Sequence, residues 1–316
     1  MNLVVCFTPL QILIAMQVID RENIDYNDIH FVYFSPIMDL KHQKYYLKIA
    51  SRAKKSTHIK EVYSFRLLRK IKKHFGLSHF NNVLLASIDD SITHYLLSYI
   101  KFDKLITFDD GLGNILKTGS YFVKHQRITI KKKLFSIIHL ILGRKYYLDD
   151  VKHRVDRHYT IYKHFENCVQ NPIPISLFKF ESLYINPDKS IDVFLGTIYR
   201  EIVIEGNEQL LKDQVINFID SFSSKPIYIP HPRAVDGEFK KYELKSEDIA
   251  EDVVQKYLND GFVVNLYGFA SSCQFNLSGV KNVNIFVLDS QCLSPAMKDG
   301  LKMLSSTLPE EHHIHL

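Results

Sequence analysis

Four short segments carry polar residues of the types that catalyse reactions or bind anions. Each follows a short apolar run, and they are residues 6–11, 107–114, 228–233 and 267–272. Open α/β sheets bind their ligands outside the carboxyl ends of the strands. If the apolar runs are strands, these segments together supply the candidate site.

The second segment contains two adjacent acids, Asp109 and Asp110, followed by Gly111, Gly113 and Asn114. Glycines permit a tight turn that exposes carboxylates. A carboxylate whose pKa is raised by burial can act as a general base. Paired acids also bind divalent metal ions, and acids at a helix N-terminus favour the helix dipole. The segment alone leaves these three interpretations open.

In the third segment, His231 lies between Pro230 and Pro232 and is followed by Arg233. The prolines restrict the backbone, so the imidazole is held rigidly after a strand. An imidazolium could protonate or hydrogen-bond a departing phosphate, and the guanidinium could pair with phosphate or carboxylate. We therefore favour a functional role for this loop over a purely structural one.

The first and last segments place hydroxyl groups where helices begin. Thr8 is positioned to cap the following helix, and Gln11 offers an amide to the cleft. Ser271 and Ser272, after Gly268, would combine hydroxyls with backbone amides as an anion site. Ordinary N-capping by these serines is the open alternative.

Hydrophobic periodicity predicts the elements that position these segments. Strand-like and helix-like stretches alternate in the first half, which indicates βαβ units and a mainly parallel sheet. Strands are expected at residues 2–7, 30–34, 59–63, 82–86 and 104–107, and helices at 10–20, 39–54 and 90–100. Residues 120–130 are typical of a hairpin and residues 134–142 of an apolar helix.

The alternation resumes after Asp188, where we place a domain boundary. Strands are expected at residues 191–195, 226–229, 263–267 and 284–288, and helices at 207–221, 247–260 and 271–277. The predicted fold is therefore α/β, with a domain of residues 1–188 and a domain of residues 189–316. Two Rossmann-like domains with a cleft between them describe the GT-B architecture, which other two-domain α/β proteins would match equally.

Composition restricts the class of protein. The 316 residues are 46% hydrophobic and 24% charged, as in soluble globular proteins. The four cysteines are widely spaced without a CxxC pair, which argues against a zinc site or disulfides and for a cytoplasmic protein. No apolar stretch is long enough to span a bilayer. The C-terminal histidines 312, 313 and 315 are expected in a solvated tail.

The formal net charge of +5 is mild, but the cations are clustered, at residues 66–73 and 127–145. Such clusters fit anionic partners. Residues 127–145 could contact an anionic membrane peripherally, or could form a helix buried between the domains. Because no nucleic-acid-binding motif accompanies the cations, we predict that the chain binds no nucleic acid.

Taken together, the chain resembles the bacterial lipooligosaccharide and capsule sialyltransferases of glycosyltransferase family 52. The matching stretches, in order, are VCFTPLQILIA (5–15), LLASIDD (84–90), ITFDDGLGNIL (106–116), RHYTIY (157–162), FLG (194–196), IPHPRA (229–234) and NLYGFASS (265–272). An acidic pair with glycine, followed later by His-Pro, is shared by several bacterial sialyltransferase families.

The resemblance implies a GT-B fold, CMP-sialic acid as donor substrate, a galactose-terminated acceptor glycan that is lipid-linked in some cases, inversion at the anomeric carbon, and neither metal nor cofactor. The donor would bind the C-terminal domain and the acceptor the N-terminal one. His231 would assist departure of the CMP phosphate. The donor would also meet Gly196, Pro232, Arg233, Gly268, Ser271 and Ser272, and Thr8, Gln11, Asp109, Asp110, Gly111 and Asn114 would line the cleft.

The chain departs from the family at one place. A carboxylate shortly after the strand ending in Leu-Gly is the family's assigned base, and here Tyr199 falls at that place. Either Glu201 supplies the carboxylate through a shifted loop, or Asp110 does, which we slightly favour. Transfer of a hexose from another nucleotide sugar and non-catalytic binding of nucleotide or glycan remain alternatives. A homodimer is compatible with the sequence.

Overall fold

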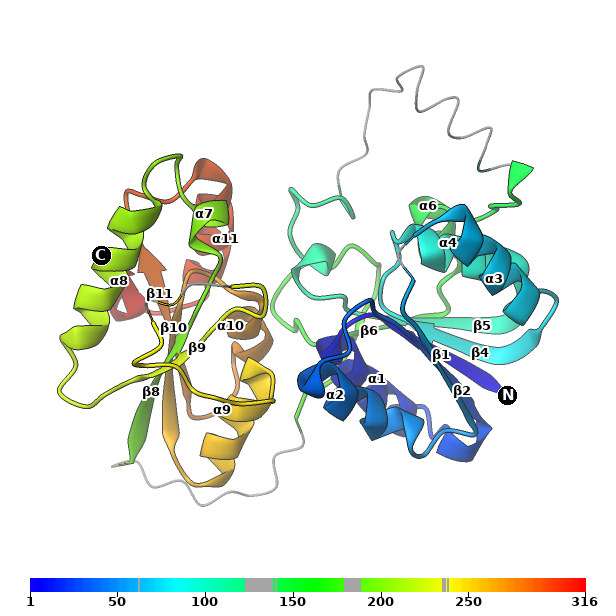
Figure 1. Cartoon of the computed structure of the whole chain (residues 1–316), viewed down its shortest axis with the longest axis horizontal. Helices are drawn as coiled ribbons and strands as arrows, with labels where there is room; N and C mark the ends of the chain where they lie inside the picture. The colour runs from blue at the N-terminus through cyan, green and yellow to red at the C-terminus, as the bar shows by residue number, and fades with distance from the viewer. Residues whose placement is uncertain (62, 123–138, 140, 179–188, 235–236, 238) are drawn as a thin grey trace. The chain divides into compact units, whose positions relative to one another are not determined.

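The computed structural model describes the whole chain except residues 62, 123–138, 140, 179–188, 235–236 and 238 (Figure 1). The described residues form two compact units, Met1–Leu177 and Phe178–Leu316. This division precedes the predicted boundary at Asp188. Most of the expected helix at 134–142 and most of the expected hairpin at 120–130 lie outside the described residues.

Within the described part of the first unit, seven strands pair in parallel in the order β3-β2-β1-β4-β5-β6-β7. They are β1 (Asn2–Cys6), β2 (Ile29–Phe34), β3 (Lys55–Ile59), β4 (His79–Leu85), β5 (Lys101–Phe108), β6 (Arg157–Thr160) and β7 (Ile173–Pro174). The chain runs outward from β1 to β3 and then restarts at β4 beside β1. The switch point therefore lies between β1 and β4, where such sheets place their ligand crevice.

Helices cover both faces of this sheet. They are α1 (Pro9–Arg21), α2 (Leu40–Ala50), α3 (Phe65–Phe75), α4 (Ser91–Tyr99) and α6 (Leu148–Arg154), with short 3₁₀ turns η1 (Tyr26–Asp28) and η2 (Leu112–Asn114). Helices α1 and α2 lie on one face, and α3, α4 and α6 lie on the other (Figure 1). Because helices cover the sheet on both faces, the central strands β1 and β2 are buried at every residue.

In the second unit, the described strands form a parallel sheet in the order β12-β11-β10-β8-β9. They are β8 (Ser190–Leu195), β9 (Ile227–Ile229), β10 (Val263–Gly268), β11 (Val283–Asp289) and β12 (His313–His315). The helices are α7 (Tyr199–Ile202), α8 (Glu208–Asp220), α9 (Ala250–Asn259), α10 (Ser272–Leu277) and α11 (Pro295–Ser305), with the 3₁₀ turn η3 (Glu310–His312). Here the switch point lies between β8 and β10.

The aromatic side chains of this second sheet form a stack across its strands. The rings of Phe194, Tyr267 and Phe286 follow one another at centroid distances of 4.9 and 4.8 Å. Phe218 from α8 packs edge-on against Phe194. Helices α9 and α10 lie on the other side of the sheet from α8 (Figure 1). The prediction of two Rossmann-like α/β units is confirmed.

Two sequence-based expectations about strands are wrong. The third strand runs from Lys55 to Ile59, earlier in the chain than the predicted residues 59–63. It is an edge strand in which only Ile59 of the five residues is buried, so its residues give little hydrophobic signal in the sequence. The C-terminal histidines do not form a solvated tail: His313–His315 is strand β12, paired with β11. The ring of His312 stacks on Phe286 at 4.4 Å. This strand is too short and polar to give a hydrophobic signal.

Candidate functional site

All four segments follow strands at the carboxyl edge of their sheet, as predicted: they come after β1, β5, β9 and β10. In the first unit, Asp110 is a half-buried carboxylate at that edge. Its Oδ1 accepts a hydrogen bond from Gln11 Nε2, and its Oδ2 accepts one from the Tyr121 hydroxyl at 2.8 Å. Its backbone N–H donates to Asn114 Oδ1 at 2.7 Å. The turn and the side chain are therefore both fixed.

The environment of Asp110 favours its protonated form. Burial raises the pKa of this carboxyl above its ordinary value, and the charge of Asp109 raises it further. Hydrogen bonds from Tyr121, Ser87 and Gln11 act in the opposite direction. A carboxyl group with a raised pKa has the proton affinity that a general base needs.

Asp109 has a different environment although it is the adjacent residue. Its side chain is fully buried. Among the described residues, its donors are His158 Nε2 at 3.1 Å, Asn167 Nδ2 at 2.8 Å, the Thr160 hydroxyl at 2.7 Å and the backbone N–H of Ile161 at 2.8 Å. This carboxylate joins β5 to the turn after β6. These contacts are those of a structural anchor, and a catalytic role for Asp109 stays an untested prediction.

The other predicted residues of this edge divide in the same way. Gly111 has φ +93°, in the region that L side chains rarely adopt, so the turn after the acids requires glycine. Asn114 is fully buried and fixes that turn, so it does not line an open cleft. Thr8 accepts from the Gln11 backbone N–H at 3.3 Å and is the N-cap of α1. Sequence reasoning missed Ser87 and Tyr121 as partners of Asp110.

In the second unit, His231 is half-buried after β9. Its Nδ1 accepts a hydrogen bond from the backbone N–H of Arg233 at 3.1 Å. Burial lowers the pKa of this imidazole below its ordinary value, the charge of Arg233 lowers it further, and Glu201 opposes both. A neutral ring whose Nδ1 accepts must carry its hydrogen on Nε2. His231 is thus a neutral donor near pH 7, whereas the sequence suggested an imidazolium.

The two candidate charges beside His231 neutralise each other. The guanidinium of Arg233 contacts both oxygens of Glu201, at 3.3 and 3.0 Å. Both side chains are exposed, as is Pro232. Because the Arg233 guanidinium donates to both oxygens of Glu201, an acceptor hydroxyl would have to compete with it for this carboxylate, so Glu201 suits the role of base less well than Asp110.

Tyr199, at the place of the family's carboxylate, belongs to the core. It is 1% exposed, its ring stacks on Phe239 at 5.3 Å, and its hydroxyl lies 3.4 Å from that of Tyr228. The side chain of Tyr228 also packs directly against Gly196. A Cβ atom added to Gly196 would lie only 2.7 Å from Cζ of Tyr228. Gly196 is therefore a packing glycine at the end of β8.

We expect Gly196→Ala to lower the free energy of unfolding by about 1–3 kcal/mol, because overpacking a filled core has this cost. The Tyr228 ring cannot retreat, since Phe239 stacks on it at 4.4 Å. Thermal unfolding measures the effect. Gly300→Ala in α11 is the matched control, because its added Cβ meets only Ala270 Cβ, at 4.0 Å. The control should be neutral or stabilising, and an equally stable Gly196→Ala would contradict the packing role.

The last segment is shaped by a residue that sequence reasoning missed, Gln274. Ser271 Oγ accepts from the Gln274 backbone N–H at 3.3 Å, and Gln274 Oε1 accepts from the Ser271 N–H at 3.0 Å. A Cβ on Gly268 would lie 2.9 Å from Gln274 Oε1. The alternative of ordinary N-capping is therefore present at Ser271 as a capping box, and the anion-site role stays a prediction. Ser271 is half-buried and Ser272 is exposed.

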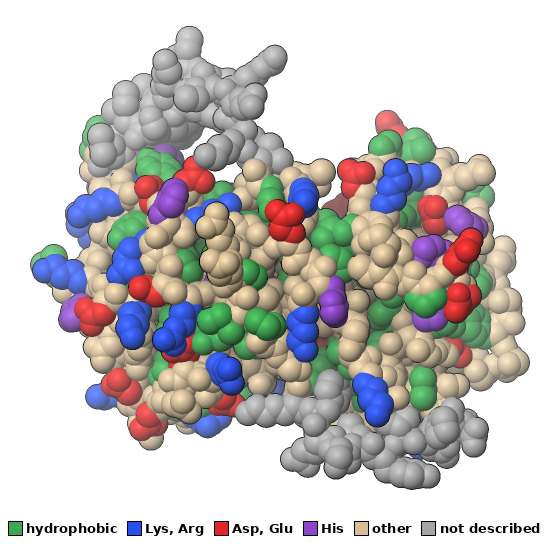
Figure 2. Space-filling view, turned by 180° about the vertical axis from the view of Figure 1, so that it is seen from behind, with side chains coloured by type: hydrophobic (Ala, Val, Ile, Leu, Met, Phe, Trp, Pro, Cys, Tyr) green, Lys and Arg blue, Asp and Glu red, His purple; other side chains and the backbone are tan. Residues whose placement is uncertain are grey.

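The described residues include no group of three or more His, Cys, Asp or Glu side chains that could hold a metal ion. Cys6, Cys168, Cys273 and Cys292 are all free thiols. No helix in the described part of the chain is long and apolar enough to cross a membrane. On the face shown in Figure 2, the described Lys and Arg side chains are interspersed with Asp and Glu side chains.

Comparisons with known proteins show similarity along both units. Residues 26–291 match the model of glycosyltransferase family 52. The chain is 32% identical to an N-acetyllactosaminide α-2,3-sialyltransferase of Haemophilus influenzae, over 90% of this chain and 91% of the relative. It is 30% identical to a CMP-N-acetylneuraminate:β-galactoside α-2,3-sialyltransferase of Pasteurella multocida, over 94% of each. A solved structure of a proposed UDP-N-acetylglucosamine 2-epimerase of Listeria monocytogenes matches with TM-score 0.47 and 10% identity, over 98% of this chain and 88% of that one.

Proposed function

Because the chain belongs to glycosyltransferase family 52, as its motifs predicted, we propose that it is a sialyltransferase. It moves sialic acid from CMP-sialic acid to the terminal galactose of a glycan. The observation that carries this proposal is the similarity, over nine-tenths of the chain, to relatives named as α-2,3-sialyltransferases. Their shared name extends the proposal to an α-2,3 linkage.

In this proposal Asp110 activates the acceptor. Its carboxylate takes the proton of the galactose hydroxyl as that oxygen forms a bond to the anomeric carbon of sialic acid. The raised pKa of Asp110 and its place at the carboxyl edge of β5 support the assignment. Glu201 is the rival base, and its pairing with Arg233 counts against it.

His231 acts on the donor. As the bond from the anomeric carbon to the phosphate oxygen breaks, its electron pair goes to that oxygen, and the Nε2–H of His231 stabilises the charge that develops there. Arg233 and the hydroxyls of Ser271 and Ser272 supply further donors to the phosphate. Direct displacement inverts the anomeric configuration. The second unit is therefore the proposed donor unit and the first the acceptor unit.

The chemistry needs only a base and hydrogen-bond donors, so we propose transfer without metal or cofactor. We place the enzyme in the cytoplasm, where it would modify a capsular or lipooligosaccharide glycan during assembly. Peripheral contact with the membrane through residues 127–145 remains part of the proposal, and most of this range lies outside the described residues. A homodimer stays a prediction for which oligomeric state in solution is the test.

A direct assay tests the proposal. Purified protein is given CMP-sialic acid and N-acetyllactosamine, and both CMP and the sialylated product are measured. We expect product in equal amounts with and without EDTA, and thermal stabilisation by CMP. Strict Mg²⁺ dependence would contradict the metal-free mechanism. Stabilisation by UDP-sugars alone would replace the sialyl donor with a hexosyl donor.

A further inference from the structure

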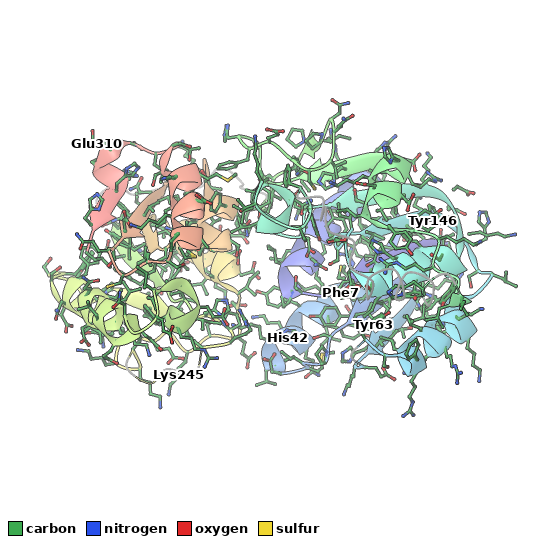
Figure 3. The ribbon with its side chains drawn as sticks, turned by 90° about the horizontal axis from the view of Figure 1, so that it is seen from above. Phe7, His42, Tyr63, Tyr146, Lys245 and Glu310 are labelled. Carbon is green, nitrogen blue, oxygen red and sulfur yellow. The ribbon has the colours of Figure 1, made fainter. Side chains whose placement is uncertain are left out.

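The amide of Gln11 has a fixed orientation at the switch point of the first sheet. The side chain is 1% exposed. Its Oε1 accepts a hydrogen bond from the backbone N–H of Phe7 at 2.7 Å. Phe7, which is labelled in Figure 3, is the first residue after β1. The Nε2 group must therefore face the other way, where it donates to the Ser87 hydroxyl at 3.1 Å and to Asp110 Oδ1. The turn after β1 thus dictates which group meets the carboxylate.

Tyr121 holds the other oxygen of the same carboxylate. Its hydroxyl donates to Asp110 Oδ2 at 2.8 Å, and its side chain is buried. Burial and then the charge of Asp110 raise the pKa of this phenol, so it stays a neutral donor at any pH of interest. Its backbone carbonyl accepts from Lys152 Nζ of α6 at 2.5 Å, which fixes the segment that carries it.

We propose that Gln11 and Tyr121 are positioning residues that hold the Asp110 carboxylate by one oxygen each and so present it to the acceptor hydroxyl in a single orientation. With the Ser87 hydroxyl the carboxylate accepts three donors, and because its two oxygens can accept about four hydrogen bonds, a lone pair remains for the incoming proton. This inference rests on the proposed role of Asp110 as base. Since both residues donate hydrogen bonds to the ionised carboxylate, they also lower the pH at which Asp110 becomes protonated and can no longer act as a base.

The other titratable groups facing this carboxylate favour its protonation. Asp109 lies beside it in the turn, and Asp90 at the start of α4 interacts with it through its charge. Asp89 acts on the Tyr121 phenol. Burial raises the pKa of the Cys6 thiol at the end of β1, so Cys6 is neutral. Against these acids, the donors from Gln11 and Tyr121 stabilise the ionised base.

The test is the pH dependence of kcat/KM for Tyr121→Phe, which removes the hydroxyl and keeps the ring. Loss of a hydrogen bond to a charged group should move the acid limb of the profile upward by about one pH unit. Tyr159→Phe is the matched control, because it removes a hydroxyl that donates to another carboxylate, Glu22. Its limb should coincide with wild type.

Gln11→Glu provides a second variant, since its carboxylate can still accept from Phe7. A like charge at this place should raise the limb further, because the two acids then share a proton. If both variants fold and the acid limb of their pH profiles stays where it is in wild type, Gln11 and Tyr121 are not positioning residues. That result would leave the proposed role of Asp110 as base intact. If Asp110→Asn retains wild-type kcat/KM, the base assignment itself fails, and the inference fails with it.

Discussion

Asp110→Asn should reduce kcat/KM for sialyl transfer by about 10²–10⁴-fold, the usual effect of losing a positioned general base, while the protein folds at least as stably as wild type. Asparagine fits the existing contacts. Its Oδ1 can accept from Gln11 Nε2, and its Nδ2 can donate to the Tyr121 hydroxyl, which accepts as readily as it donates. The variant therefore removes the proton acceptor and leaves the site intact.

The stability part follows from the raised pKa of Asp110. The folded state binds this proton more tightly than the unfolded state, so the ionised carboxylate destabilises the fold. That cost is absent below the unfolded pKa, grows as pH rises to the folded pKa, and is complete above it. The asparagine variant carries no charge at this position and escapes the cost at neutral pH. Thermal unfolding measured from pH 4 upward should show the variant gaining on wild type as the pH rises.

The adjacent acid is the matched comparison. Asp109→Asn replaces one carboxylate oxygen with an NH₂ group, which cannot accept a hydrogen bond. The backbone N–H of Ile161 donates to one oxygen of Asp109, and the Asn167 amide donates to the other. The backbone N–H can only donate, and the Asn167 amide cannot flip because its Oδ1 accepts from the N–H of Val169. Each stranded buried donor costs about 1–3 kcal/mol. We expect this variant to unfold at a lower temperature. If the two variants exchange these behaviours, the division of roles is wrong.

Glu201→Gln decides between the rival bases. The side chain is exposed, and glutamine can still accept from Arg233. We expect its kcat/KM to stay within several-fold of wild type. A large loss here, together with an active Asp110→Asn, would move the base to Glu201.

The placement of the four segments could be predicted because burial periodicity is local and parallel strands share one carboxyl edge. The partners of each side chain could not be predicted. Gln11 and Asp110 are 99 residues apart, and His158 and Asp109 are 49 apart. Such contacts depend on the register between β1, β4, β5 and β6, about which the residue types say nothing.

The acidic pair shows the limit most clearly. Successive side chains at a strand end point in opposite directions, so one of two adjacent acids enters the protein and the other does not. Sequence alone gives no sign of which. The buried Thr160 hydroxyl and the half-buried Asn167 amide donate to Asp109, and neither lies in a catalytic motif that the sequence indicates. Capping and glycine signals, by contrast, were local enough to predict Thr8 correctly as an N-cap.

His231→Ala should lower kcat by about 10²–10⁴-fold, because it removes the group aimed at the charge that develops on the leaving phosphate. The side chain is half-buried on a loop, so the variant should fold. His231→Gln is the informative companion. Its amide can place an N–H near the position of Nε2, and we expect it to recover part of the lost rate. Equal losses in both variants would point to proton transfer in place of hydrogen bonding.

The pH profile separates these two roles independently. Because burial and Arg233 lower the pKa of His231, the ring is neutral throughout the range above pH 7. A neutral Nε2–H donor keeps working there, so transfer should not decline between pH 7 and pH 8. An acid that must deliver its proton would instead lose activity as pH rises through its lowered pKa. On the acidic side, protonation of Nδ1 abolishes the hydrogen bond from the Arg233 N–H. A rate that rises steadily as the pH falls would therefore contradict the neutral donor.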